Sequence, residues 1–281
     1  MTDLSLPARA EAPSVQRGPL RVVRALNGDG GVPITLLSTL GLLVAWAVVT
    51  KLKLIAPLFL PSPLDVAKQF YSVAVDGFSN ATLLQHVGTS LFRVTSGFAI
   101  AAAIGIPLGL AMGMNRWVRG IVSPPIQLYW PVPPLAYLPL VIIWFGIGET
   151  AKITLLALAM FAPIVVSAQA GVRSVSVARI HAAQTLGASR AQVFRHVVLP
   201  SALPEILTGL RLGIGSGWGT LVAAELVAAT KGLGFMTLSA AQFLVTDVVF
   251  VGILTIAALA AAFLFALRLL ERTLTPWKGQ E

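Results

Sequence analysis

The chain has no cysteine, only three histidines and few charged residues. The lack of cysteine excludes disulfides and thiol chemistry, and the scattered histidines show no ligand spacing, so we expect no metal site and no cofactor. Charged residues make up 11%, against about 25% in soluble domains, and hydrophobic residues 56%, against about 45–50%. With a mean hydropathy of +0.85, this composition indicates an all-α integral membrane protein.

The net charge of +9 would suggest a nucleic-acid partner in a soluble protein. Here the basic residues fall between apolar runs, where they act as signals of membrane topology. We therefore expect no nucleic acid among the partners.

The first 33 residues are polar and basic and contain Arg9, Arg17, Arg21 and Arg24. No apolar core of a signal peptide lies near the start, so we interpret residues 1–33 as a cytoplasmic arm. The rest of the chain, residues 34–281, is predicted to be one transmembrane domain.

Apolar segments predict about six membrane spans. These are Ile34–Thr50, Thr95–Met114, Leu135–Gly148, Ile153–Val172, Ile206–Ala229 and Val248–Leu270. The third is the weakest, because it is short and a series of prolines before and inside it breaks helix hydrogen bonds. We expect this region to be buried in the assembly or to line a path, where the freed backbone groups find partners.

A further helix is predicted after Ser62, which can cap it, with Pro63 at its first position. Apolar residues then recur at helical spacing at Leu64, Ala67, Phe70, Tyr71 and Ala74. This pattern is equally typical of an amphipathic helix on the outer membrane surface and of a helix packed on the spans.

The longest polar insertion runs from Arg173 to Arg211 and predicts two short helices with a bend between them. Ser176 can cap the first helix, and Gly187 can end it in the left-handed conformation. Ser189 and Gln192 form a capping box that starts the second helix, and Pro200 is predicted to end it. Such a unit loses little side-chain entropy on docking. The alternative is a solvated connector between two spans.

Residues 181–200 carry a motif within this loop: His181-Ala182-Ala183, then Gly187, then Val197, Leu199 and Pro200. The stretch resembles the coupling loop of ABC importer permeases, whose pattern is Glu-Ala-Ala, three residues, Gly, nine residues, a β-branched aliphatic, any residue, Leu-Pro. His181 departs from the pattern because it replaces the glutamate. If that glutamate forms an ion pair with the ATPase in the family, the packing of Ala182 and Ala183 carries the contact here.

The resemblance extends over most of the chain from Pro57 to Trp277 and includes residues 131–140, 144–149 and 222–230. These segments resemble the permeases of the importer group that handles taurine, alkanesulfonates and nitrate. Within this group they are most similar to the taurine permeases. The resemblance implies a type I ABC importer fold in a bacterial inner membrane, with cytoplasmic coupling helices in the loop 173–200. It also implies a homodimer, two ATPase subunits that bind ATP, and a periplasmic substrate-binding protein. The implied ATPase contact comprises His181, Ala182, Ala183, Gly187, Leu199 and Pro200.

Charge distribution gives a separate test of orientation. With both termini in the cytoplasm, thirteen basic residues fall inside and six outside. The inner set is Arg9, Arg17, Arg21, Arg24, Arg116, Arg119, Arg173, Arg179, Arg190, Arg195, Arg268, Arg272 and Lys278; the outer set is Lys51, Lys53, Lys68, Arg93, Lys152 and Lys231. This orientation also puts the loop in the cytoplasm.

The fifth predicted span contains Arg211, Trp218 and Glu225, seven residues apart and therefore within about 40° of one stripe. A charge in mid-bilayer costs at least about 2.5–3.5 kcal/mol, so neither ionised side chain should face lipid. Either the three residues line a translocation path between two copies, or Arg211 reaches the cytoplasmic surface and Glu225 meets water or an arginine near the outer boundary. Gly209, Gly213 and Gly217 should let another helix approach closely. Outside the span, Glu149 and Lys152 predict a surface ion pair at an outer turn.

These features favour a subunit of an ATP-driven importer for taurine or a similar sulfonate over an enzyme. The chain has no phosphate-binding G-x-x-x-x-G-K-[ST] motif, as expected if a partner hydrolyses ATP. Another small anion, such as an alkanesulfonate or nitrate, is the alternative substrate. An ion-coupled secondary transporter is less well supported, because no second proline-broken segment indicates an inverted repeat.

Overall fold

The computed structural model describes residues 31–226 and 229–276. Within these ranges the regular elements are helices, joined by short turns and one isolated bridge between Phe78 and Ala81. The chain divides into two compact units, Met1–Ile55 and Ala56–Glu281. The first contains α2 (Gly31–Lys51), and the predicted arm lies outside the described residues up to position 30.

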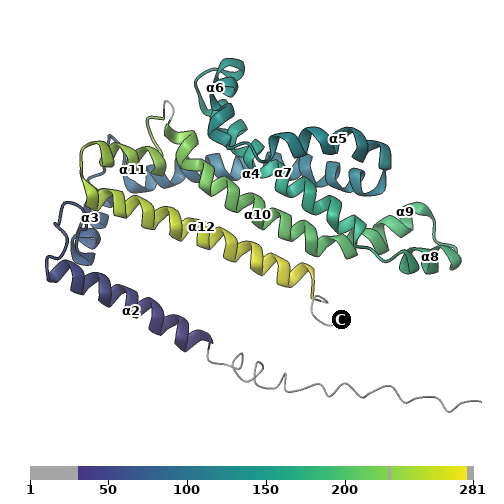
Figure 1. The fold of residues 1–281 in the computed structure, drawn as a ribbon, viewed down its shortest axis with the longest axis horizontal. Helices are drawn as coiled ribbons and strands as arrows, with labels where there is room; N and C mark the ends of the chain where they lie inside the picture. The colour runs from purple at the N-terminus through teal and green to yellow at the C-terminus, as the bar shows by residue number, and fades with distance from the viewer. Residues whose placement is uncertain (1–30, 227–228, 277–281) are drawn as a thin grey trace, which may run out of the picture. The chain divides into compact units, whose positions relative to one another are not determined.

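The second unit contains the other helices (Figure 1). They are α3 (Pro63–Val75), α4 (Leu83–Met114), α5 (Arg116–Tyr129), α6 (Pro134–Phe145), α7 (Glu149–Arg173), α8 (Val177–Thr185), α9 (Arg190–Val193), the π-helix η1 (Phe194–Val198), α10 (Leu199–Leu226), α11 (Leu233–Gln242) and α12 (Thr246–Leu274).

Four helical segments of the described chain are long and apolar enough to cross a membrane: α4, α7, the continuous run Arg190–Leu226, and α12. A fifth span is formed if α5 and α6 count as one bent pair, and the apolar part of α2, Leu36–Lys51, is shorter. The count agrees roughly with the six predicted spans. The all-helical membrane fold is therefore confirmed.

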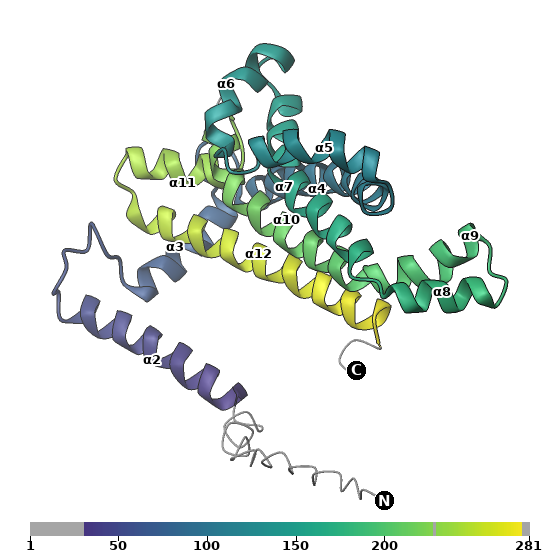
Figure 2. The same cartoon turned by 45° about the vertical axis from the view of Figure 1, so that its right-hand side comes forward.

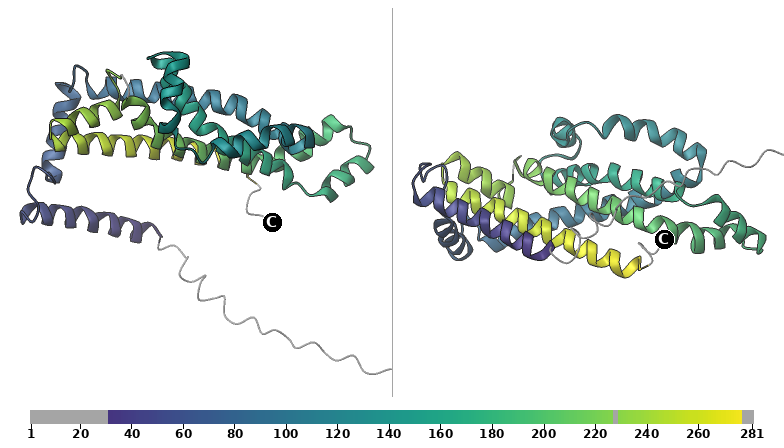
Figure 3. Two further views of the ribbon diagram at one scale, coloured as in Figure 1. Left: turned by 45° about the horizontal axis from the view of Figure 1, so that its top comes forward. Right: turned by 60° about the horizontal axis from the view of Figure 1, so that its bottom comes forward.

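The proline-rich region contains a break and not a straight span. α5 and α6 meet at 107° around the turn at residues 130–133. Pro124, Pro125 and Pro139 nevertheless lie inside helices. At 1.5 Å per residue, the twelve residues of α6 extend only about 18 Å, so α6 cannot cross a bilayer alone. In the left view of Figure 3 α6 projects from the bundle, while its inner residues Leu138 and Val141 are buried in the core that α7 and α10 form.

The core is built on α7, which packs between α4 and α10. On α10 the glycines at 209, 213 and 217 face Ser167, Ile164 and Met160 of α7, so their predicted role is confirmed. α4 presents a second glycine series to an adjoining face of α7, and Ile164 meets both Gly105 of α4 and Gly213 of α10. A Cβ on Gly109 would lie 2.5 Å from the Val165 carbonyl oxygen, which leaves room only for glycine.

The start of α3 is as predicted, because the Ser62 hydroxyl accepts a hydrogen bond from the Asp65 amide at 3.2 Å. α3 contacts α12 and α4, and its buried residues are Val66 and Val73. Leu64 and Tyr71, from the predicted apolar face, are 65% and 71% exposed. That face is therefore not the one packed on the bundle, and its place at the membrane surface stays a prediction.

Candidate functional site

The loop between α7 and α10 forms two short helices joined at a fixed bend. Gly187 has φ +83°, the left-handed conformation predicted for it. The Ala188 amide donates to the Ala183 carbonyl at 3.0 Å, and the Gly187 amide donates to the Gln184 carbonyl at 2.9 Å. This pair of bonds is a Schellman motif, which satisfies the last carbonyls of α8. The chain therefore turns sharply at residue 187.

The helix starts in this loop agree only partly with the prediction. Ser189 and Gln192 make both bonds of the capping box that starts α9. Ser176 occupies the N-cap position of α8, but its side chain makes no capping hydrogen bond. The beginning of α8 is therefore held by its backbone and by its contacts with the loop.

The prediction that Pro200 ends the second helix is wrong. The helix continues from α9 through η1 into α10, where Pro200 is the second residue. Proline has no amide to donate and its ring crowds the preceding turn, so a helix accommodates it at lower cost where the bonding pattern already changes. The wide π-turn supplies that change: the Leu199 amide bonds to Phe194, five residues back, and the helix passes Pro200 without a break.

The bend leaves small and apolar side chains accessible. His181, Ala182 and Gly187 are exposed, and Leu186 is 89% exposed. Beside them lies a cavity of about 310 Å³. It is lined by Ala183, Leu186, Gly187, Ala188, Gln192, Val193, His196 and Val197. Below it, Val175, Val193 and Val198 are buried together and hold the two short helices in place. Residues 173–200 thus form a rigid unit with an apolar notch, which we call the knob.

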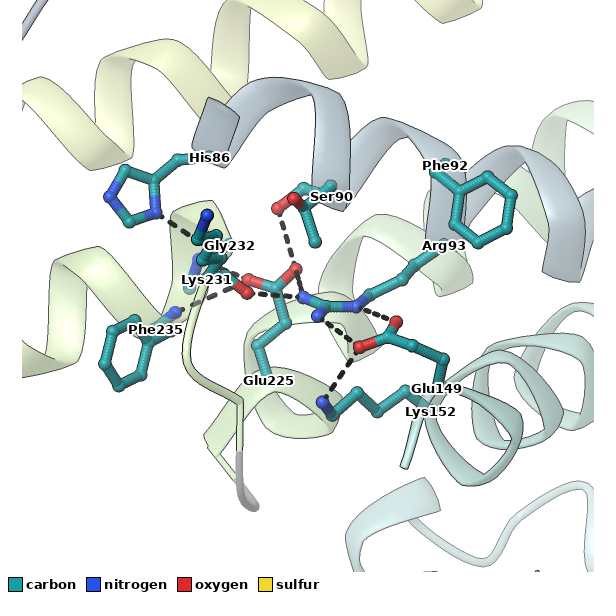
Figure 4. Close-up of polar contacts among 12 residues, drawn as sticks. His86, Ser90, Phe92, Arg93, Glu149, Lys152, Glu225, Lys231, Gly232 and Phe235 are labelled. Carbon is teal, nitrogen blue, oxygen red and sulfur yellow. Dashed lines mark hydrogen bonds and ion pairs between the residues drawn. The ribbon is translucent and has the colours of Figure 1, made fainter. Parts of the chain in front are cut away.

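A buried polar cluster occupies the other end of α7 and α10 (Figure 4). Arg93 of α4 is 2% exposed, and its Nε and Nη2 donate to the two carboxylate oxygens of Glu149 at 2.7 Å each. Lys152 Nζ lies 3.1 Å from Glu149 Oε1. The predicted pair of Glu149 and Lys152 is therefore present, and the Glu149 side chain is 48% exposed. Lys152, however, is 5% exposed, and the bidentate partner of Glu149 is Arg93.

Glu225 of α10, 0% exposed, is the second carboxylate of the cluster. Its Oε1 accepts hydrogen bonds from Arg93 Nη1 and from the Ser90 hydroxyl, both at 2.7 Å. Its Oε2 accepts from the amides of Gly234 at 2.7 Å and Phe235 at 3.4 Å, in the first turn of α11. A carboxylate at this position satisfies orphan amides and is favoured by the helix dipole.

The turn before α11 is fixed by the same cluster. His86 Nδ1 accepts from the Gly232 amide at 3.1 Å, while its Nε2 lies 3.0 Å from the Phe78 carbonyl oxygen, so the protonated nitrogen is Nε2. Gly232 has φ +140°, and a Cβ there would collide with the Glu225 carboxylate. With Arg93 and Lys152 against Glu149 and Glu225, the formal charges of the cluster cancel.

The knob and the cluster lie at opposite ends of the same helices. α7 begins at Glu149 in the cluster and reaches the loop at Arg173, about 36 Å away at 1.5 Å per residue. α10 returns from Leu199 to Glu225. Figures 1 and 2 show α8 and α9 at the end of the bundle remote from α11. The two sites therefore lie near opposite faces of a membrane crossed by these helices.

The three residues of the predicted path are not together on one open surface. Arg211 is partly exposed and pairs with Glu271 of α12 at 3.0 Å. Trp218 is 6% exposed in the core, and its Nε1 is buried without a partner in the described part of the chain. Glu225 contacts an arginine, as predicted by the alternative in which it meets water or an arginine near the outer boundary.

Arg93 is the main residue that sequence reasoning missed, because it was assigned to the outer surface. α4 begins twelve residues before the predicted span, so Arg93 lies inside a helix of 32 residues. The available signal was the run Ser90-Leu91-Phe92-Arg93-Val94, which continues the apolar pattern of the span. A lone arginine in such a run needs a buried carboxylate partner.

The sequence and the fold are similar to those of known transport proteins. Residues 105–276 match the family of binding-protein-dependent transport system inner membrane components. The chain belongs to this family. The permease is 59% identical to the taurine transport system permease protein TauC of Escherichia coli, over 85% of this chain and 87% of that protein. It is 37% identical to the putative aliphatic sulfonates transport permease protein SsuC of the same organism, over 84% and 89%.

The fold agrees with solved structures. The permease matches a chain of the inward-facing MetNI methionine ABC transporter with a TM-score of 0.58 and 21% identity, covering 69% of this chain and 96% of that one. At this identity the likeness supports the fold alone. The permease is thus a multi-pass component of the inner membrane and a transport subunit.

The buried cluster predicts a sharp loss of stability when one charge is removed. Replacing Glu225 by glutamine keeps its size but leaves Arg93 with one carboxylate partner in place of two. Breaking a buried pair in this way destabilises by about 3–5 kcal/mol. We expect a clearly lower thermal unfolding temperature of the detergent-solubilised permease, measured by tryptophan fluorescence.

Glu205→Gln is the matched control, because Glu205 is exposed on the same helix. It should change the unfolding temperature little. Equal unfolding temperatures for the Glu225 and Glu205 variants would show that the cluster does not hold the helices together.

Proposed function

We propose that the permease is the membrane-spanning subunit of an ATP-driven importer that carries taurine or a similar small sulfonate across the inner membrane. The observation that supports this best is the 59% identity to a taurine transport permease over nearly the whole of both chains. The 37% identity to sulfonate permeases supports alkanesulfonates as the alternative substrates. A secondary transporter that works alone fits poorly with a family named for its dependence on a binding protein.

The proposed assembly contains two copies of the permease, a pair of ATPase subunits in the cytoplasm and a periplasmic binding protein. Both termini lie in the cytoplasm in this arrangement, and the knob at residues 173–200 faces the ATPase. The exposed Leu186 and the notch beside Gly187 support docking, since exposed apolar surface on a rigid unit gives binding energy at little cost in entropy. If the family glutamate forms an ion pair with the ATPase, that pair is absent here because His181 stands in its place. The packing of Ala182 and Ala183 then carries the contact.

The knob can transmit movement because its connections to the bundle are stiff. α7 runs into it with only Ser174, Val175 and Ser176 between helices, and α10 leaves it through an unbroken helical run. When the ATPase subunits close on ATP, the knob moves and both helices move with it. The permease then alternates between inward-open and outward-open states.

Substrate identity is tested by reconstitution. The permease in proteoliposomes, with its ATPase inside and its binding protein outside, should accumulate radiolabelled taurine when ATP is present. Calorimetry on the binding protein should show tighter binding of taurine than of ethanesulfonate or nitrate. Uptake driven by an ion gradient without ATP would contradict the proposal and favour a secondary transporter.

Docking is tested at Gly187. Gly187→Val forces a β-branched residue into the left-handed conformation, at a cost of at least about 1–2 kcal/mol, although no atom lies within 4 Å of its Cβ position. We expect the variant to insert into the membrane and to lose substrate-stimulated ATPase activity.

Gly187→Asn is the matched control, because asparagine tolerates this conformation. It should retain most of the stimulation. Normal stimulation in the valine variant would mean that the bend does not position the ATPase contact.

We further propose that the translocation path follows α10, along which Arg211, Trp218 and Glu225 lie. The Arg211 side chain is 31% exposed, although Nη1 pairs with Glu271 and Nη2 donates to the Thr208 hydroxyl at 3.4 Å, so it is the residue of the three best suited to meet an anion. Trp218 and Glu225 are buried in this conformation, so they can join the path only in a state in which α10 separates from α4 and α7.

Replacing Arg211 by alanine separates the two roles of this side chain. If Arg211 meets the anion, uptake should fall while basal ATPase activity stays at the wild-type level. An equal loss of uptake and basal ATPase activity would show instead that the pair with Glu271 serves packing of α10 on α12. Both rates are measured in the same proteoliposomes.

A further inference from the structure

A cavity of about 310 Å³ lies where the bend between α5 and α6 meets α7 and α10. It is lined by Tyr129, Trp130, Val132, Pro134, Tyr137, Leu158, Ala159, Ala162, Ser216, Gly219 and Thr220. Its volume is at the lower end of the roughly 300–1,000 Å³ of small-molecule sites. It is separate from both the knob and the buried cluster, whose residues it does not share.

The lining combines aromatic rings and hydroxyl groups with no ionised side chain. The hydroxyl hydrogen of Ser216 goes to the Leu212 carbonyl at 3.2 Å, and that of Thr220 goes to the Ser216 carbonyl at 2.9 Å. Because these hydrogens are engaged, the two lining hydroxyls can offer a ligand only the remaining lone pairs of their oxygens, as acceptors. Tyr137 adds a phenolic group, which can donate. A cavity with these groups offers donors, acceptors and π faces, but no net charge.

α10 gives a ligand close access to this cavity. Gly215, Ser216 and Gly219 are exposed, and no atom lies within 4 Å of a Cβ position on either glycine. These glycines differ from Gly209, Gly213 and Gly217, where atoms of α7 occupy the space that a Cβ would need. The exposed face of α10 is thus polar and shallow at the mouth of the cavity, where lipid contact alone would favour larger apolar residues.

We propose that this cavity is a transient binding site for the transported molecule and selects an aminosulfonate zwitterion over a simple anion. The inference rests on the proposed function. The ammonium group lies against the aromatic rings, with Trp130 as the strongest cation–π partner, and against the acceptor oxygens of Ser216 and Thr220. The sulfonate accepts a hydrogen bond from Tyr137.

Charge decides between the two kinds of ligand. A lone anion in a cavity without a cationic side chain loses hydration that the Tyr137 hydroxyl replaces only in part, whereas a zwitterion brings its own counter-charge. The site is also suited to weak binding, because it contains no ion pair to the ligand. Weak binding is what a transport path needs, since the molecule must leave again.

The test uses ligand-induced thermal stabilisation of the purified permease–ATPase complex, which needs no binding protein. Taurine should raise the unfolding temperature of the wild type, and ethanesulfonate at equal concentration should raise it less. Trp130→Leu should weaken taurine binding at least about threefold, as expected for a lost cation–π contact, and Trp130→Phe should restore part of it. Trp117→Leu is the matched control, because Trp117 lies on α5 outside the cavity and is 70% exposed.

A second variant tests the sulfonate contact without removing a ring. Tyr137→Phe should reduce the stabilisation by taurine and by ethanesulfonate alike, with Tyr71→Phe on α3 as its control.

The same taurine-induced shift of the unfolding temperature in the wild type, Trp130→Leu and Tyr137→Phe would show that taurine does not bind in this cavity. Equal loss of taurine and ethanesulfonate stabilisation in Trp130→Leu would overturn selection by the aromatic ring. Wild-type taurine uptake, measured separately, tests the importer itself, so uptake with unchanged shifts would reject this inference alone.

Discussion

Arg93 can be buried among apolar helices only because two carboxylates share it. Glu149 occupies one side of the guanidinium with two bonds, and Glu225 and the Lys231 carbonyl accept from Nη1. Arg93 is on α4, and its partners come from α7, α10 and the turn before α11. The requirement to neutralise one charge therefore fixes four segments of the chain. The first turn of α11 in turn depends on Glu225 for its amide partners. The glycine series bring the same helices close enough for these bonds to form.

The architecture places contrasting sites at the two ends of one stiff body. At one end, ionised groups are locked and have little freedom to rearrange. At the other, the knob leaves small and apolar side chains exposed. α7 and α10 connect the two, and close packing along their length lets a displacement at the knob reach the far end. The cavity beside the α5–α6 bend lies along these helices, where a change in their separation would alter its shape.

Local signals in the sequence were sufficient for the bend at Gly187 and the start of α9, and insufficient for the cluster. Gly187 and the Ser189–Gln192 box act within a few residues, so their geometry follows from the sequence alone. Arg93, Glu149 and Glu225 are far apart in the chain, and only tertiary packing brings them together. The same reason applies to α3, where the partner helix decides which of two apolar stripes is buried. Pro200 misled because the prediction considered an α-helix and not a π-turn.

The π-turn itself sets the relative direction of the knob and α10. A π-helix holds one extra residue per hydrogen-bonded turn, and each residue of an α-helix corresponds to about 100° of rotation. Without the extra residue in Phe194–Val198, every side chain of α10 would be turned by about that angle relative to the knob. Glu225 would then point away from Arg93, and the glycines that receive α7 would face elsewhere. The length of this short segment thus acts as an angular setting between the knob and α10.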